Sequence, residues 1–194
     1  MIAEDNEQIG FGQLPADTLH LSQRVSNLPT VLDELNSLVK QGVIKDYAIG
    51  GGYAVMYYGI PYSTFDLDVL VLLGSEGDFH NLYTHYYHKG NKIENVYIYI
   101  SNMPVQFLPN YISPLFNSAI KKAKQITVSG VPSKIVKLEH LIVLLLTAFR
   151  PKDKIHILEL AKNANMSTLD RILKSFDDEQ HVLSKRLKEV LGNS

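Results

Sequence analysis

Ile49-Gly50-Gly51-Gly52 and, after thirteen intervening residues, Asp66-Leu67-Asp68-Val69 are the stretches of sequence that decide the fold. Side chains two positions apart on a strand point to the same face, so Asp66 and Asp68 would lie side by side. Two adjacent carboxylates repel each other unless a cation neutralises them, and hard divalent ions such as Mg²⁺ prefer oxygen ligands. Where a strand turns into a helix through glycines, backbone N–H groups and the helix dipole favour phosphate oxygens. Together the motifs predict a nucleoside triphosphate held through Mg²⁺.

Each motif also has a purely structural interpretation. Consecutive glycines can mark only a tight turn or close packing. An Asp-x-Asp pair can be the solvated end of a strand. Either interpretation is the better one for a motif standing alone, but the joint occurrence of both motifs at this spacing favours the functional interpretation.

Hydrophobic periodicity and turn residues predict mostly strands in the middle of the chain and mostly helices at its end. Helices are expected at residues 29–40, 54–58, 78–88, 113–124, 138–149, 152–163, 167–176 and 179–191. Strands are expected at residues 46–49, 65–72, 93–100, 105–108, 126–128 and 133–136. The helix at 167–176 is expected to start with a capping box, Ser167-Thr168-Leu169-Asp170. This order predicts an α+β fold, with a mixed sheet and a helical C-terminal extension.

We divide the chain into an N-terminal arm (1–26), a core (27–136) and a helical C-terminal region (137–194). Residues 1–120 carry 5 basic and 12 acidic side chains, whereas residues 121–194 carry 14 basic and 8 acidic ones. Such an asymmetry indicates an anionic partner or a self-complementary assembly, so an oligomer is possible.

Composition excludes several classes of protein. The chain has no Cys, which excludes a disulfide framework, zinc fingers, thiol catalysis and iron-sulfur ligation. The N-terminus lacks the basic region and apolar run of a signal peptide. Apolar runs are far shorter than the roughly 20 residues that span a bilayer. We therefore expect a cytoplasmic protein with no membrane contact.

The glycine and aspartate motifs together resemble the nucleotidyltransferase superfamily that includes DNA polymerase beta. Its signature is a hydrophobic residue and two small residues, a spacer, and then two Asp separated by a hydrophobic residue. The wider context IGGGYAVMYYGIPYSTFDLDVLV (residues 49–71) is similar to the minimal prokaryotic branch related to AbiEii-type toxins and MNT-type antitoxins. VQFLPNY (105–111) and LEHLIVLLLTAFRPKD (138–153) also look like that branch. The resemblance covers about residues 45–165 and implies a nucleotidyltransferase fold.

The resemblance also implies a reaction, in which a hydroxyl nucleophile attacks the α-phosphorus of a nucleotide and pyrophosphate leaves. Mg²⁺ or Mn²⁺ would be the cofactor, and ATP or another NTP the substrate. Asp66 and Asp68 would be the catalytic metal ligands, and Gln106 would occupy the position of a third ligand. Nucleotide contacts are expected from Gly51, Gly52, Tyr62, Thr64 and Lys152.

Three positions depart from the pattern of active relatives. Gln106 stands where an Asp would be expected, and an amide can neither bind a cation as strongly nor accept a proton in the same way. Relatives commonly have Arg at the position of Tyr62 and often Lys at that of Leu145. Glu94 could substitute for the third carboxylate. These departures leave a second interpretation open, namely a catalytically silent protein of the same fold that binds a protein or a nucleic acid. A third is an unrelated α+β binding domain.

Other side chains carry a weaker signal. His80, His85 and His88 share a predicted helix, where a surface or packing role is the better interpretation than metal binding. The segment 150–154 follows an apolar helix and could lie near the mouth of the cleft. The acceptor could be a tRNA 3′ end, a protein side chain or a small molecule. The resemblance implies a toxin-antitoxin or phage-defence setting, with a cognate toxin or antitoxin protein or an RNA as partner.

Overall fold

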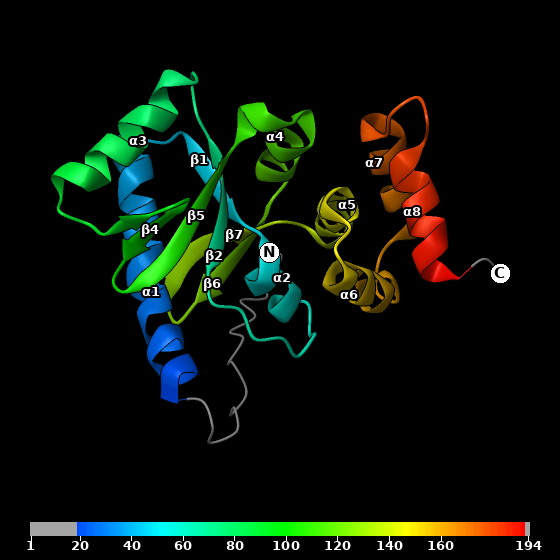
Figure 1. The fold of residues 1–194 in the computed structure, drawn as a ribbon, viewed down its shortest axis with the longest axis horizontal. Coiled ribbons are helices and arrows are strands. Elements are labelled where there is room, and N and C mark those ends of the chain that lie inside the picture. Colours follow the sequence, from blue (N-terminus) through cyan, green and yellow to red (C-terminus); the bar gives the residue numbers. More distant parts are fainter. Residues whose placement is uncertain (1–18, 193–194) are drawn as a thin grey trace, which may run out of the picture.

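The structure of the chain is a computed structural model that describes residues 19–192 (Figure 1). Its helices are α1 (Leu19–Lys40), α2 (Gly51–Tyr57), α3 (Gly77–His88), α4 (Pro114–Lys121), α5 (Leu138–Ala148), α6 (Pro151–Ala161), α7 (Met166–Phe176) and α8 (Val182–Leu191), with a 3-10 turn at Asn110–Ile112. Its strands are β1 (Asp46–Ile49), β2 (Leu67–Leu72), β3 (Ile93–Glu94), β4 (Tyr97–Ile100), β5 (Met103–Pro109), β6 (Lys124–Val128) and β7 (Val131–Ile135). The α+β class with a mixed sheet and a helical C-terminal section is confirmed.

The strands form one mixed sheet in the order β3-β4-β5-β2-β1-β7-β6. The central strand β2 runs antiparallel to β1 and parallel to β5. β7 pairs with β1 in parallel at Ile49 and Ile135, and the N–H of Val136 donates to the carbonyl of Ile49 at 2.9 Å. This order brings the end of β1, the start of β2 and the end of β7 together at the same end of the strands.

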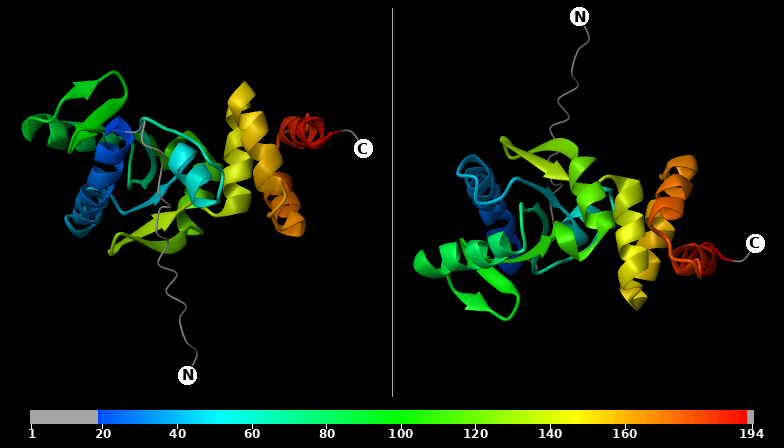
Figure 2. Two further views of the ribbon diagram at one scale, coloured as in Figure 1. Left: turned by 90° about the horizontal axis from the view of Figure 1, so that it is seen from below. Right: turned by 90° about the horizontal axis from the view of Figure 1, so that it is seen from above.

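Helices cover both faces of the sheet and extend beyond one end of it (Figures 1 and 2). α1 and α3 lie on one face, linked to each other by an ion pair between Glu34 and Lys89. α4 packs against β1 and β2 on the other face, next to α5. α6, α7 and α8 follow α5 and lie away from α1 and α3. None of the helices in the described part of the chain has the length and apolar character needed to cross a bilayer.

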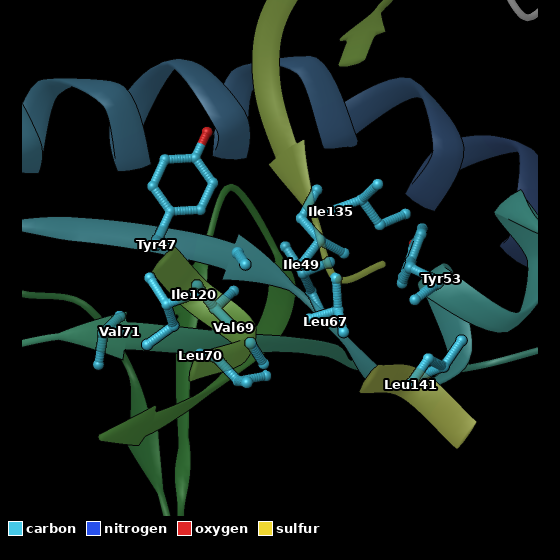
Figure 3. Close-up of a cluster of buried hydrophobic side chains, with 14 of the residues drawn as sticks. Tyr47, Ile49, Tyr53, Leu67, Val69, Leu70, Val71, Ile120, Ile135 and Leu141 are labelled. Carbon is cyan, nitrogen blue, oxygen red and sulfur yellow. The ribbon is translucent and has the colours of Figure 1, made fainter. Parts of the chain in front are cut away.

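The alternation of side chains along β1 and β2 supplies the core on both faces. Figure 3 shows Tyr47 pointing from β1 toward α1, where its hydroxyl donates to Asn36 Oδ1 at 2.9 Å. At the end of β1 lies a cluster of Ile49, Leu67 and Ile135, each of which has an exposed fraction of at most 2 %. Fully burying an aliphatic side chain stabilises a fold by about 1.5–3 kcal/mol, so this cluster holds the strand ends firmly.

The first helix begins at Leu19, ten residues before the predicted start at Pro29. Proline is favoured in the first turn of a helix, which is why the sequence suggests a start there. Leu28 precedes Pro29 and is as deeply buried as Leu32 and Leu35. The apolar face therefore continues through the proline, and packing on the sheet outweighs the lost hydrogen bond. Residues 1–18 of the predicted arm lie outside the described residues.

Other element boundaries differ because of local backbone geometry. The predicted strand 93–100 is interrupted at Asn95, whose φ of 54° ends the pairing of β3. The turn between β4 and β5 is the two-residue pair Ser101-Asn102, both with positive φ, rather than a four-residue turn. α7 is capped by the side chain of Asn165, which accepts from the N–H of Thr168, so the predicted capping box at Ser167 is wrong.

Candidate functional site

The two aspartates lie in the middle of the sheet, at the end of the strands where β1 ends and β2 begins. Asp68 is the second residue of β2, and Asp66 immediately precedes the strand. The register places Asp68 directly beside Gln106 of β5, as the sequence predicted for the third position. A cleft of about 400 Å³ opens over these side chains, between the sheet and α5 and α6. Gly51, Gly52, Tyr62, Thr64 and Lys152 all line it, so the structure brings every predicted site residue together.

The glycine turn is packed directly against the second aspartate. The N–H of Gly50 donates to the backbone carbonyl of Asp68 at 2.9 Å. A Cβ at Gly51 would lie 1.7 Å from Asp68 Oδ2, and the φ of Gly51 is +51°. Real Cβ atoms never approach so closely, and the backbone conformation itself disfavours a side chain. Glycine at position 51 is therefore required to set the start of α2 on the Asp68 carboxylate.

The carboxylate of Asp68 is strongly perturbed. Burial, and to a smaller extent repulsion from Asp66, raise its pKa to about 6. Arg150 and Lys152 oppose the rise, which places both cations within electrostatic range of the cleft floor. Ionised Asp68 is thus a costly charge in the protein without a bound cation, and a cation bound beside it would relieve the repulsion.

Asp66 is held by two hydroxyl groups. Thr64 Oγ1 donates to Asp66 Oδ1 at 2.9 Å, and the phenol of Tyr97 donates to Asp66 Oδ2 at 3.1 Å. Tyr97 lies on β4, directly beside Gln106 in the register. Sequence reasoning missed Tyr97 because nothing local connects it to Asp66. The only available signal was its position in the strand opposite Gln106.

The opposite wall of the cleft comes from α6 and from the loop before Asp66. Lys152 Nζ donates to the hydroxyl of Tyr62 at 3.1 Å. The ring of Tyr62 lies edge-on against His156, with 4.6 Å between ring centroids. His156 is buried and its pKa is lowered, chiefly by that burial. It was not predicted as a site residue, because a single His inside a helix gives no sequence signal of its own.

The inner part of the cleft is apolar. Leu70 and Leu108 lie one pleat further along β2 and β5 than Asp68 and Gln106, on the same face of the sheet. Leu145 and Phe116 close this part from α5 and α4. Leu145 therefore lines the cleft and contributes no charge to it.

Several other candidate side chains lie away from the cleft. Glu94 is exposed and pairs with Lys92 at 2.8 Å, so it does not replace the third carboxylate. The three histidines of α3 lie across the sheet from the cleft. Among the side chains of residues 27–192, no three His, Asp or Glu gather in a metal-binding arrangement.

A larger groove of about 720 Å³ lies between α1 and the β6–β7 hairpin. Asp46 lines this groove, but its carboxylate is already neutralised by Lys134 at 2.6 Å. The aspartate pair and the glycine turn both belong to the smaller cleft, which is why we assign the candidate site there.

The donor set of the cleft fits a hard divalent cation. Asp66 and Asp68 offer carboxylate oxygens, and Gln106 offers an amide oxygen beside Asp68. Oxygen donors of this kind suit Mg²⁺ or Mn²⁺, and a cation beside Asp68 would favour the ionised carboxylate, which burial and Asp66 disfavour. Gln106 adds no charge, so the set is weaker than one of three carboxylates.

Sequence comparisons give no match, since no protein-family model and no curated protein is significantly similar to the chain. Solved structures do match. An antigenic nucleotidyltransferase-like protein from Paracoccidioides brasiliensis superposes with a TM-score of 0.58 at 15% identity, over 89% of this chain and 87% of that one. The chain has a nucleotidyltransferase-like fold. The antibiotic-resistance factor ANT(2'')-Ia gives a TM-score of 0.51 at 12% identity, over 76% of this chain and 89% of that one. The predicted fold is thereby confirmed.

Proposed function

We propose that the protein is a nucleotidyltransferase that uses Mg²⁺ or Mn²⁺ to transfer a nucleoside monophosphate from ATP or another NTP to a hydroxyl acceptor. The observation that carries this proposal is the packing of the Gly51 turn against the Asp68 carboxylate. It puts the start of a helix and a pair of carboxylates at one point of a cleft whose opposite wall is cationic. A metal-bound triphosphate needs these groups in this arrangement.

Each side chain of the cleft has a distinct part in the proposed reaction. Asp66 and Asp68 would hold the metal, which supplies electrostatic stabilisation of the charge on the phosphoryl oxygens. Thr64 and Tyr97 keep the Asp66 carboxylate in place by donating to its two oxygens. The amides of Gly51 and Gly52 would contact the phosphates. Lys152 lies at the opposite wall, where its ammonium would face them.

The test is binding and transfer by the intact chain. Calorimetry with Mg²⁺ and a non-hydrolysable ATP analogue should show saturable binding by the wild type and none by D66A/D68A. Circular dichroism should show both proteins to be folded. An α-³²P-labelled NTP should label the acceptor only with the wild type. A folded wild type that binds neither metal nor nucleotide would disprove the proposal.

Gln106 favours a second candidate, a catalytically silent protein of the same fold that acts by binding. An amide beside Asp68 cannot accept the proton of the attacking hydroxyl. The Gln106→Asp variant separates the two candidates, because it restores a third carboxylate at the paired position. If the wild type transfers nucleotide slowly, Q106D should transfer it faster. If the wild type binds nucleotide but transfers none, the catalytically silent binding protein is the better candidate.

The biological setting is also part of the proposal. The resemblance of residues 49–71 to AbiEii-type toxins and MNT-type antitoxins supports a place in a toxin-antitoxin or phage-defence pair. The partner would be the cognate toxin or antitoxin protein, or an RNA acceptor. Affinity purification of the tagged wild type, with sequencing of bound RNA and mass spectrometry of bound protein, tests this assignment. Recovery of neither class would contradict it.

A further inference from the structure

Arg150 is the cation of the cleft that the structure fixes most firmly. Its Nε donates to Asp153 Oδ2 at 2.8 Å, and its second guanidinium nitrogen, Nη2, donates to Asp153 Oδ1 at 3.2 Å. The backbone N–H of Arg150 also donates to Asp153 Oδ2, at 2.9 Å. This fork geometry orients the planar guanidinium, which a single contact would leave free to turn.

The two partners differ sharply in exposure. The side chain of Asp153 is 1 % exposed, whereas that of Arg150 is 57 % exposed and lines the cleft. A guanidinium has five N–H donors, and Asp153 engages two of them. Within residues 27–192, Asp153 is the acceptor that the structure gives this guanidinium. Arg150 lines the cleft whose floor carries Asp68, and the charge of Asp68 influences Arg150, so the donors that Asp153 does not engage are available to a ligand there.

The chain turns sharply just before Arg150 to bring it to this position. Phe149 has φ 50° and ψ 35°, a left-handed conformation that is unfavourable for a residue with a side chain. Lys154 and Arg186 lie over its ring at 4.4 and 4.8 Å and hold it there. Local strain of this kind persists only where surrounding contacts impose it, and it is common at binding sites.

The positive charge of the cleft wall comes from the start of α6, where Arg150 and Lys152 line the cleft. Tyr62 and Leu145 line it without charge. Lys152 already donates to the hydroxyl of Tyr62, whereas Arg150 presents unused donors to the cleft.

We propose that Arg150 binds the phosphate tail of the nucleotide and that buried Asp153 is the positioning residue that aims it. The inference rests on the proposed function and adds to it the residue that recognises the polyphosphate. A helix cap alone would explain the backbone contact of Asp153, but it does not require the fork to the guanidinium.

The first experiment is calorimetry with three probes, Mg²⁺-ATP, inorganic tripolyphosphate and AMP. Arg150→Ala should weaken binding of Mg²⁺-ATP and of tripolyphosphate by about 10-fold, because one charge-assisted contact is lost. Binding of AMP should change less than 3-fold. Arg150→Lys keeps the charge but loses the fork, so it should fall between the wild type and R150A. Lys162→Ala is the matched control at the C-terminal end of α6, since Lys162 pairs with Glu159 and is not one of the residues that line the cleft.

The second experiment tests whether Asp153 acts through Arg150. Asp153→Asn should weaken binding of Mg²⁺-ATP and tripolyphosphate, and R150A/D153N should bind no more weakly than R150A. If the losses of binding free energy in R150A and D153N add up in the double variant, Asp153 has only a structural role, and its part of the inference is overturned. R150A binding as tightly as the wild type would overturn the whole inference. Failure of the wild type itself to bind Mg²⁺-ATP would instead overturn the proposed function.

Discussion

Replacing Asp68 by Asn should stabilise the metal-free protein at neutral pH. Burial and the neighbouring Asp66 raise the pKa of Asp68 from its ordinary value of 3.8 to about 6. The difference corresponds to about 3 kcal/mol of folding free energy, which the ionised carboxylate costs the native state. Asn has nearly the same shape and never ionises, so D68N avoids this cost and still fits under the Gly51 turn.

The sign of the pH dependence follows from the two protonation states. Below about pH 4 Asp68 is protonated in both the folded and the unfolded chain, so D68N and the wild type should have similar stability. Between about pH 4 and 6 the folded protein keeps the proton that the unfolded chain loses, and the wild type loses stability as the pH rises. Above about pH 6 Asp68 is ionised in the folded protein as well, and the wild type bears the full destabilisation of about 3 kcal/mol.

Urea unfolding in EDTA at pH 4 and pH 7.5 measures the effect. The free energy of unfolding of D68N should exceed that of the wild type by about 2–3 kcal/mol at pH 7.5 and by less than about 1 kcal/mol at pH 4. Asp170→Asn, an exposed substitution on α7, should change the stability by less than about 0.5 kcal/mol at both values. A D68N variant no more stable than the wild type at pH 7.5 would refute the reasoning. Added Mg²⁺ should stabilise the wild type and leave D68N unchanged.

Three further predictions concern residues around the same cleft and the core. Gly51→Ala should reduce Mg²⁺-ATP affinity more than 10-fold and lower stability by several kcal/mol, because its Cβ would meet Asp68. Gly90→Ala, with φ +75° and no atom near its Cβ, should cost only about 1 kcal/mol, and equal effects would contradict the packing argument. The pKa of Tyr97 is raised, chiefly by its hydrogen bond to Asp66, and NMR of ring-labelled tyrosine should show it returning toward 10.0 in D66N. Burial lowers the pKa of His140 to about 4. As the pH falls from 6.5 to 4, the free energy of unfolding of the wild type should therefore fall by about 3 kcal/mol relative to that of H140Q. Urea unfolding measures it, and an equal pH dependence of stability in the two proteins would show the prediction to be wrong.

The parts of the site that the sequence predicts are those encoded within one continuous stretch. The glycine turn, the aspartate pair and Thr64 all lie between Ile49 and Val71, so their spacing alone relates them. These features depend on strand periodicity and turn chemistry, both of which are local. Gln106 was singled out only through the family resemblance, and the register pairs it with Asp68.

The parts that the sequence does not predict arise from contacts between distant elements. Tyr97 reaches Asp66 only because β4 lies two strands from β2. His156 and the orientation of Arg150 depend on the corner at Phe149, and a left-handed phenylalanine has no sequence signature. The early start of α1 has the same cause, since packing against the sheet continues the helix through Pro29.

The pairing of β7 with the end of β1 also determines when the cleft can form during synthesis. The aspartate pair is translated long before α6, and at typical elongation rates the intervening residues take on the order of 10 seconds to emerge. α5 and α6 can be set opposite Asp68 only after Ile135 has joined Ile49, a contact between remote parts of the chain that closes slowly. A nascent chain therefore has its carboxylates early and its cations late, and it gains a complete cleft only after α6 has been translated.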